Sequence, residues 1–367
     1  MSVAADASAG DPAVLWVDDL SDRSVPRAGS KIARLGELRR CGVAVPDGFV
    51  VTTRVYEEFL QATGAGAEID AALAAVPPGD DGAIAHAAAR ARAAVEGRAL
   101  PDALAEVLTE AYEELSFRRR DLNIPVAVRS SATGEDGTDA SFAGQFDTYL
   151  GVTGASRLLE KVRACWGSLF TERAVGYRLR NDLDHRQSPM AVGVLELVHA
   201  RTSGVAFSIH PVTGNAHRMV IEGSWGWGEA VVQGLVTPDH IEVGKSDRRV
   251  LAYEVAEKKV CSAFDYSQGL VVEREMPRRL RCERILEEEE IQAVVSAVLS
   301  IEERYGYPVD VEWVLDRHRR PGDPVTIVQT RPVTVTPEEE ATPRWDPVAY
   351  AAKYAFGGRG GGGVGGR

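Results

Sequence analysis

The sequence has few of the features that mark disulfide-rich, metal-finger or membrane proteins. Its four cysteines are widely spaced, without a CxxC motif or a cysteine–histidine cluster, which argues against a disulfide framework or a zinc site. No apolar run reaches about 18 residues, so no membrane span is expected. The N-terminus has no basic segment before an apolar stretch, so no secretory signal is expected. We therefore expect a reduced, cytoplasmic protein.

Positive charge is also scarce. The formal net charge of the 367 residues is −12, which argues against general nucleic-acid binding because that function needs a basic face. With 44% hydrophobic and 26% charged residues, the composition is that of a globular protein with room for two or three modules. Any nucleotide phosphate must then be met by a few placed cations or by metal.

Residue patterns divide the chain into three parts. Residues 1–195 are mixed and rich in helical patterns, whereas 196–335 are rich in strand patterns. Residues 336–367 end in a glycine tract and are expected to form a flexible tail. In the first part we expect a helix from Ser30 to a stop at Gly42. The remaining expected elements there are strands at 14–17, 49–53 and 126–129 and helices within 54–120, broken near 77–82, and 157–180.

The second part is expected to contain mostly strands. Six segments alternate or are continuously apolar, and one segment has helical spacing. The strands are expected at 191–198, 203–209, 219–225, 240–243, 309–315 and 325–333, and the helix at 286–306. The fold class predicted from this order is mixed α/β or α+β.

Two cations of the first part stand where an anion could bind. Lys31 falls in the first turn of a predicted helix, where a cation opposes the helix dipole but where amides and an ammonium can share one phosphate. Arg129 ends an apolar strand and could pair with phosphate oxygens. The alternatives are a solvated surface lysine and an ion pair of Arg129 with Glu135 or Asp136.

A polar loop follows Arg129 between residues 129 and 148. It combines hydroxyl and amide donors with glycines, which allow a backbone to approach a ligand closely. The candidate ligand-binding residues in it are Ser130, Thr133, Ser141, Gly144 and Gln145. An ordinary connecting loop would also have this composition.

The strand pair near the C-terminal end is the third candidate element. Both strands alternate at period two, and a turn-rich connection joins them, so a hairpin is expected. Symmetric pairing would place Glu312 opposite Gln329, and Asp310 opposite Arg331. A carboxylate and an amide oxygen so placed suit magnesium. The alternative is a solvent-facing Asp–Arg pair without a metal.

Five segments together resemble the ATP-binding domain of the phosphoenolpyruvate synthase and pyruvate phosphate dikinase family, which includes rifampin phosphotransferase. They are GSKIARLGEL with VAVPDGFVVTT, VAVRSSATGEDGTDASFAGQFDTYLGV, SGVAFSIHPVTG, GSWGWGEAVVQGLVTPD, and VDVEW with VQTRPVT. They follow the family order from about residue 29 to 334. The resemblance implies an ATP-grasp-like fold in which two subdomains close over ATP.

The resemblance also implies roles for residues. Lys31, Arg129 and Arg331 would contact phosphates and carry catalysis, and Glu312 and Gln329 would hold Mg²⁺. Asp310 would belong to the same site, the loop from Ser130 to Gln145 would cover the triphosphate, and Glu196 to Val198 would face adenine. Two positions depart from the family pattern: Leu195 replaces a frequent glutamine, and His210 replaces an aspartate before the turn.

The seven histidines bear on the function. Members of the family pass the phosphoryl group to a histidine in a glycine-rich motif, and no histidine of this sequence lies in such a motif. We therefore expect an Mg-dependent, ATP-cleaving phosphotransferase component that hands phosphoryl or pyrophosphoryl to a histidine on a separate carrier protein. The final small-molecule acceptor is unknown. The alternatives are a kinase or ligase acting directly on a small molecule, and a non-catalytic nucleotide-binding module.

Overall fold

A computed structural model describes residues 11–74, 76–77, 79–133, 146–181, 183–187, 189–228, 236–265 and 270–333. These residues form two compact units, which are described separately. Unit 1 comprises the described residues of Met1–Ala140, Gln145–Val198 and Phe264–Val271. Unit 2 comprises those of His199–Ala263 and Val272–Arg367. None of the described helices has the length and apolar character that crossing a membrane requires.

The division into units differs in detail from the subdomains predicted at 1–195 and 196–335. The strand that ends at Glu196 is hydrogen-bonded on both sides to strands of unit 1, so the change of unit falls after Val198. A short return of the chain, Phe264–Val271, also belongs to unit 1. Phe264 lies against Gly151, where an added Cβ would come within 2.7 Å of its ring.

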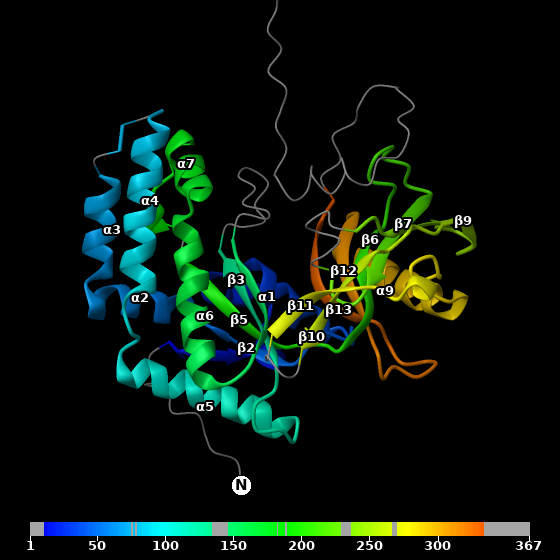
Figure 1. Cartoon of the computed structure of the whole chain (residues 1–367), viewed down its shortest axis with the longest axis horizontal. Helices are drawn as coiled ribbons and strands as arrows, with labels where there is room; N and C mark the ends of the chain where they lie inside the picture. The colour runs from blue at the N-terminus through cyan, green and yellow to red at the C-terminus, as the bar shows by residue number, and fades with distance from the viewer. Residues whose placement is uncertain are drawn as a thin grey trace, which may run out of the picture. The chain divides into compact units, whose positions relative to one another are not determined.

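Unit 1 contains a five-stranded sheet whose pairings are antiparallel (Figure 1). Its strands, in spatial order, are β1 (Val14–Trp16), β2 (Gly48–Val51), β5 (Met190–Glu196), β3 (Val126–Ala132) and β4 (Thr148–Val152). The predicted strand at 49–53 ends at Val51, because Thr53 begins a helix. The strand predicted at 126–129 continues to Ala132, which places residues after Arg129 in the sheet.

Helices cover both faces of this sheet. They are α1 (Val25–Arg40), α2 (Thr53–Thr63), α3 (Ala65–Leu73), α4 (Asp81–Glu96), α5 (Asp102–Arg118), α6 (Ala155–Gly167) and α7 (Glu172–Arg180). Ile32 and Leu35 of α1 form a core with Val50, Ala191 and Leu195 on one face. The alternate residues of the same strands face a larger core with the other helices. The predicted break near 77–82 is confirmed, since α4 begins at Asp81.

Unit 2 contains a six-stranded antiparallel sheet. Its strands, in spatial order, are β13 (Thr326–Pro332), β12 (Val309–Asp316), β6 (Ala200–Phe207), β7 (Arg218–Trp225), β8 (Asp239–Gly244) and β9 (Val250–Glu254). Helix α9 (Glu288–Tyr305) packs against β12 and β6 (Figure 1). A separate pair, β10 (Val260–Asp265) and β11 (Leu270–Glu275), was not predicted, and neither was β9. Helices with antiparallel sheets confirm the mixed fold class in its α+β form.

A buried ion pair joins the segment after β9 to the sheet of unit 2. The Nζ atom of Lys258 donates to Oδ1 of Asp239, and both side chains are 0% exposed. The Asp239 carboxylate also accepts from Ala256 N at 3.0 Å, Tyr253 OH at 3.1 Å and Ile285 N at 3.2 Å. One carboxylate therefore holds β8, the segment after β9 and the segment before α9 together.

This arrangement generates a stability prediction. Replacing Lys258 by Met should lower the free energy of unfolding by about 3–5 kcal/mol, because the Asp239 carboxylate stays buried without its cation. The change is measured by urea unfolding followed by tryptophan fluorescence. Lys259→Met is the matched control, because Lys259 is 66% exposed and pairs only at the surface with Glu257. It should change stability by less than about 1 kcal/mol. Equal losses in the two variants would contradict a structural role for the buried pair.

Candidate functional site

The pairing of β12 with β13 is the register that the sequence predicts. Glu312 lies opposite Gln329, and Asp310 lies opposite Arg331. The register shifts only after Glu312, between Glu312 and Trp313. Residues directly opposite each other in an antiparallel pair have Cβ atoms about 4.5–5.5 Å apart. The structure therefore brings an acid–amide pair and an acid–cation pair together on neighbouring positions of one hairpin.

The acid–cation pair is a direct ion pair. Nε of Arg331 donates to Oδ2 of Asp310 at 2.6 Å. The Asp310 side chain is 3% exposed and that of Arg331 is 22% exposed. The pair expected as the alternative to a metal site is thus formed, but its carboxylate is buried rather than solvent-facing. A buried carboxylate on Nε fixes the plane of the guanidinium, which is the group that binds phosphate in two-point contacts.

The two pairs lie on the sheet face opposite α9. An added Cβ at Gly223 would come within 2.9 Å of Trp313 and 2.7 Å of Ile285, which leads into α9. Trp313 therefore points to the α9 face, and strand alternation places Asp310 and Glu312 on the other face. We call that other face, with its side chains from β13, β12, β6, β7 and β8, the polar face.

A row of paired positions crosses the polar face. Glu312 is paired with Gln329 on one side and with Val205 on the other. Val205 is paired with Glu222, and Glu222 with His240. Side chains at paired positions lie on the same face, so the row carries Gln329, Glu312, Glu222 and His240.

Glu222 and His240 were not identified from the sequence. Nδ1 of His240 lies 3.1 Å from Oε1 of Glu222, and both residues are buried. Burial raises the pKa of Glu222 above its ordinary value, although His240 opposes the shift. Burial by itself would lower the pKa of His240, but the hydrogen bond and charge of Glu222, together with the charges of Glu242 and Glu254, outweigh it and raise that pKa. The alternation in 219–225 and 240–243 allowed both strands to be predicted. It did not predict that the two strands pair and bring Glu222 next to His240.

In unit 1, the backbone of α1 approaches the backbone of β3 closely, and this contact fixes the position of Lys31 in the chain. Gly29 has a φ of +69° inside α1, and an added Cβ there would lie 1.9 Å from the carbonyl oxygen of Ser131. On either side of Lys31, Ser30 Oγ donates to Ala132 O at 3.4 Å and Ile32 N donates to Ser131 Oγ at 3.2 Å. The helix begins at Val25 rather than at the predicted cap Ser30, but its direction changes at Gly29.

Arg129 shares a sheet face with this contact. Arg129 and Ser131 are two residues apart in β3, so both side chains lie on the α1 face. Gly193 is paired with Arg129, and a Cβ there would lie 2.3 Å from Ile32 Cδ1, so the glycine admits α1 beside the arginine. Lys31 and Arg129 are therefore held on one side of one sheet.

Ser130 lies on the opposite sheet face from Arg129. Its side chain is buried, and within the described structure its Oγ has no hydrogen-bond partner. Thr133 is half-buried just after β3. Ser141, Gly144 and Gln145 lie outside the described residues, as do the rest of 134–145 and the tail after 333. The ligand-binding roles of these loop residues stay predictions.

The segment expected to face adenine follows β5. Glu196 forms an ion pair with Arg119 at 2.5 Å, and its backbone N–H donates to Asp47 O at 2.7 Å. Val198 is the last residue of unit 1 before the chain enters unit 2. Leu195, which departs from the family pattern, packs in the core with α1. An apolar residue at this position therefore has a packing role.

His210, the second departure, caps a turn. Its Nδ1 atom accepts from Val212 N at 3.2 Å and Thr213 N at 3.3 Å. These are the contacts that a side-chain carboxylate oxygen makes in an Asx turn. Burial lowers the pKa of His210, in agreement with a neutral ring that accepts hydrogen bonds. The imidazole thus replaces the function of an aspartate in the local backbone structure.

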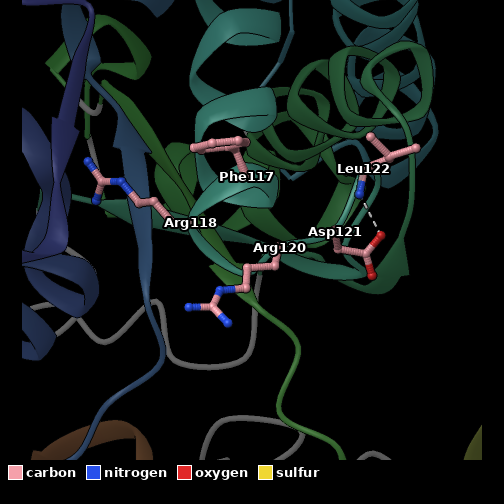
Figure 2. Close-up of a pocket in the computed structure, with 5 residues that line it drawn as sticks. All are labelled: Phe117, Arg118, Arg120, Asp121 and Leu122. Carbon is pink, nitrogen blue, oxygen red and sulfur yellow. Dashed lines mark hydrogen bonds between the residues drawn. The ribbon is translucent and has the colours of Figure 1, made fainter.

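An open hollow at the end of α5 is a separate surface feature of unit 1. Figure 2 shows the five residues that line it, Phe117, Arg118, Arg120, Asp121 and Leu122. Phe117 and Leu122 are exposed, and Asp121 Oδ1 accepts from Leu122 N at 2.6 Å. None of the residues predicted to bind a ligand lines this hollow, so it is distinct from the polar face and from the Lys31 region.

The donor set of the polar face fits a magnesium ion. In the described part of the chain, no group of three or more His, Cys, Asp or Glu side chains could hold a metal by itself. Magnesium is held by one or two protein oxygens together with substrate phosphates. A carboxylate opposite an amide, as in Glu312 and Gln329, supplies that number of oxygens. The site would therefore bind metal together with a phosphorylated ligand rather than in its absence.

The contact at Gly29 can be tested by substitution. Gly29→Ala should destabilise the protein by more than about 2 kcal/mol, because the new Cβ collides with Ser131 O and also strains a positive φ. Gly42→Ala is the matched control, since its φ is +83° but nothing lies within 4 Å of the added Cβ. It should cost about 1 kcal/mol. Thermal unfolding of both variants measures the difference, and equal costs would rule out the close approach.

Comparisons with known proteins identify the family of this chain. The family of the pyruvate phosphate dikinase AMP/ATP-binding domain matches residues 25–349. A probable phosphoenolpyruvate synthase of Methanothermobacter thermautotrophicus is 40% identical over 335 residues, which cover 90% of this chain and 48% of that protein. For the Archaeoglobus fulgidus protein of the same name, the identity is 40% over 327 residues, covering 89% and 42%. The phosphoenolpyruvate synthase of Pyrococcus furiosus is 35% identical over 367 residues, covering 90% and 44%.

The chain thus spans less than half the length of these relatives, while the family match covers most of the chain. The fold of this family is ATP-grasp-like, in agreement with the mixed architecture of helices and antiparallel sheets. The protein belongs to the pyruvate phosphate dikinase AMP/ATP-binding domain family.

Proposed function

We propose that this protein binds Mg·ATP and transfers a phosphoryl or pyrophosphoryl group to a histidine on a separate carrier protein. The observation that carries the proposal is the β12–β13 register, which pairs Glu312 with Gln329 and Asp310 with Arg331. In the proposed complex, Glu312 and Gln329 would hold Mg²⁺, which would supply positive charge against the phosphates. Arg331, oriented by Asp310, binds a phosphate.

The cations of unit 1 would complete the site. Lys31 and Arg129 lie on one face of the sheet of unit 1, and the same face carries the start of the regular part of α1. At an effective dielectric constant near 20, a cation about 4 Å from a phosphate charge contributes about 4 kcal/mol. Phosphoryl transfer depends mainly on positioning and on such charge stabilisation. Three placed cations and a metal are therefore the components that this chemistry requires.

A histidine outside this sequence would accept the phosphoryl group. The relatives named phosphoenolpyruvate synthase extend well beyond the segment that this chain matches. Within the described structure, His240 is hydrogen-bonded to Glu222, and His210 caps a turn. In the transfer, the bond between a bridging oxygen and phosphorus breaks, a nitrogen–phosphorus bond to the carrier imidazole forms, and ADP or AMP leaves.

Calorimetric titration with Mg·ATP tests the binding step. Glu312→Gln should weaken binding at least tenfold, because the metal loses its anionic ligand, and this loss should be absent when ATP is titrated with EDTA present. Glu303→Gln is the matched control on the exposed side of α9 and should change affinity less than twofold. An unchanged affinity in Glu312→Gln would contradict the metal role of the polar face.

Labelled nucleotides test the transfer step. The protein is incubated with β- or γ-labelled ATP and, as carrier, the part of the Methanothermobacter thermautotrophicus relative that this chain does not match. We expect label on the carrier in an acid-labile, alkali-stable form, and less of it with Lys31→Gln. Lys259→Gln, an exposed lysine, is the control. ATP binding without any labelled carrier would contradict transfer to histidine, and label on a small molecule without carrier would support a direct kinase.

A further inference from the structure

We propose that His240 is a positioning residue of the nucleotide site. It compensates the charge of Glu222, so that Glu312 is the carboxylate of the polar face whose charge the metal neutralises. This inference rests on the proposed function, because it concerns how the polar face of unit 2 accepts Mg·ATP. It adds two residues, Glu222 and His240, to that site. Neither residue would contact the nucleotide.

Register places the pair beside the proposed metal ligands. The row of paired positions runs from Gln329 and Glu312 through Val205 to Glu222 and His240. Adjacent strands are about 4.8 Å apart, so Glu222, two strands from Glu312, is separated from it by about 10 Å at the backbone. The charge of Asp310 also reaches Glu222: it raises the pKa of Glu222, although burial raises that pKa more.

Burial strengthens the electrostatic interactions between the charged side chains of this row. Glu222 is 3% exposed, His240 6% and Asp310 3%. Water screens charges at such positions less than at the surface. Asp310 is paired with Arg331, and Glu222 is hydrogen-bonded to His240, whose Nε2 also lies 3.8 Å from Oε1 of Glu242. Glu242 lies further along β8 and pairs with Arg218 at 2.5 Å.

Loss of His240 would change this balance. Glu222 would then lack its hydrogen-bonded partner and would lie near the carboxylate of Asp310. An ionised Glu222 would then be an uncompensated buried negative charge about 10 Å at the backbone from Glu312, on the face proposed to bind an anionic ligand. At an effective dielectric near 20, one charge at this distance changes affinity by about tenfold. Removing the Glu222 charge instead would add no repulsion.

The two members of the pair should therefore have effects of opposite sign. At pH 8, His240→Gln should weaken Mg·ATP binding about tenfold. Glu222→Gln should leave the affinity unchanged or up to about threefold tighter. The double variant should bind within about twofold of the original protein. His217→Gln, at an exposed histidine in the turn before β7, is the matched control and should have no effect.

Calorimetry of the four variants and the original protein, with thermal unfolding measured in parallel, distinguishes this role from a structural one. A pair that only stabilises the sheet would make both single variants bind more weakly, and that result would overturn the proposal. An unchanged affinity in His240→Gln would overturn it as well. If His240→Gln does not fold, Glu222→Gln decides: weakened binding contradicts the proposal, and undiminished binding supports it.

The same titrations separate this inference from the proposed function. If the original protein binds Mg·ATP and Glu312→Gln weakens it while His240→Gln does not, the inference is wrong and the proposed function stands. If the original protein does not bind Mg·ATP, the proposed function is wrong and the inference fails with it.

Discussion

The antiparallel register between β12 and β13 is the constraint on which the candidate site of unit 2 depends. A strand exposes alternate side chains to opposite faces, so a slip by one residue would turn Asp310 and Glu312 toward α9. The apolar residues Val309, Val311 and Trp313 prevent this slip because they must face the helix. The same hydrophobic pattern that attaches α9 to the sheet therefore places the acids on the polar face, opposite their amide and cation partners.

A comparable constraint acts independently in unit 1. The absence of a side chain at Gly29 and Gly193 lets α1 approach β3 and β5 within contact distance of their backbones. Hydrogen bonds from Ser30 and Ile32 then fix the helix on the end of β3. Lys31 lies between these two anchors, and Arg129 lies on the same face of the strand they contact. In both units, close packing of apolar or small residues positions the charged residues proposed to bind ATP.

Much of this could be predicted from the sequence because the signals are local. Period-two alternation was enough to predict the hairpin and its register, and helical spacing was enough to predict α1 and α9. The strand predicted to end at Arg129 continues to Ala132. Because the prediction was too short, it did not show that Ser130 lies on the opposite sheet face from Arg129 and Ser131. Thr52 and Thr53, β-branched residues after a strand, gave no local sign that a helix begins there.

The remaining features depend on contacts between distant residues. Lys258 lies in the charged segment AEKKV, which is typical of a surface turn, and only the fold shows that its ammonium is buried on Asp239. Glu222 and His240 are 18 residues apart and meet because β7 pairs with β8. The capping role of His210 required the turn geometry, since a histidine in place of an aspartate gives no signal by itself.

We propose that Glu312, Gln329 and Arg331 hold Mg·ATP and that Lys31 and Arg129 contact its phosphates. The most direct measurement is a crystal structure with Mn²⁺ and a non-hydrolysable ATP analogue, with the metal located by its anomalous signal. The account predicts that the metal is bound by side-chain oxygens of Glu312 and Gln329 and that phosphates contact the Lys31 ammonium. A metal bound elsewhere, or a triphosphate that does not contact Lys31, would contradict it.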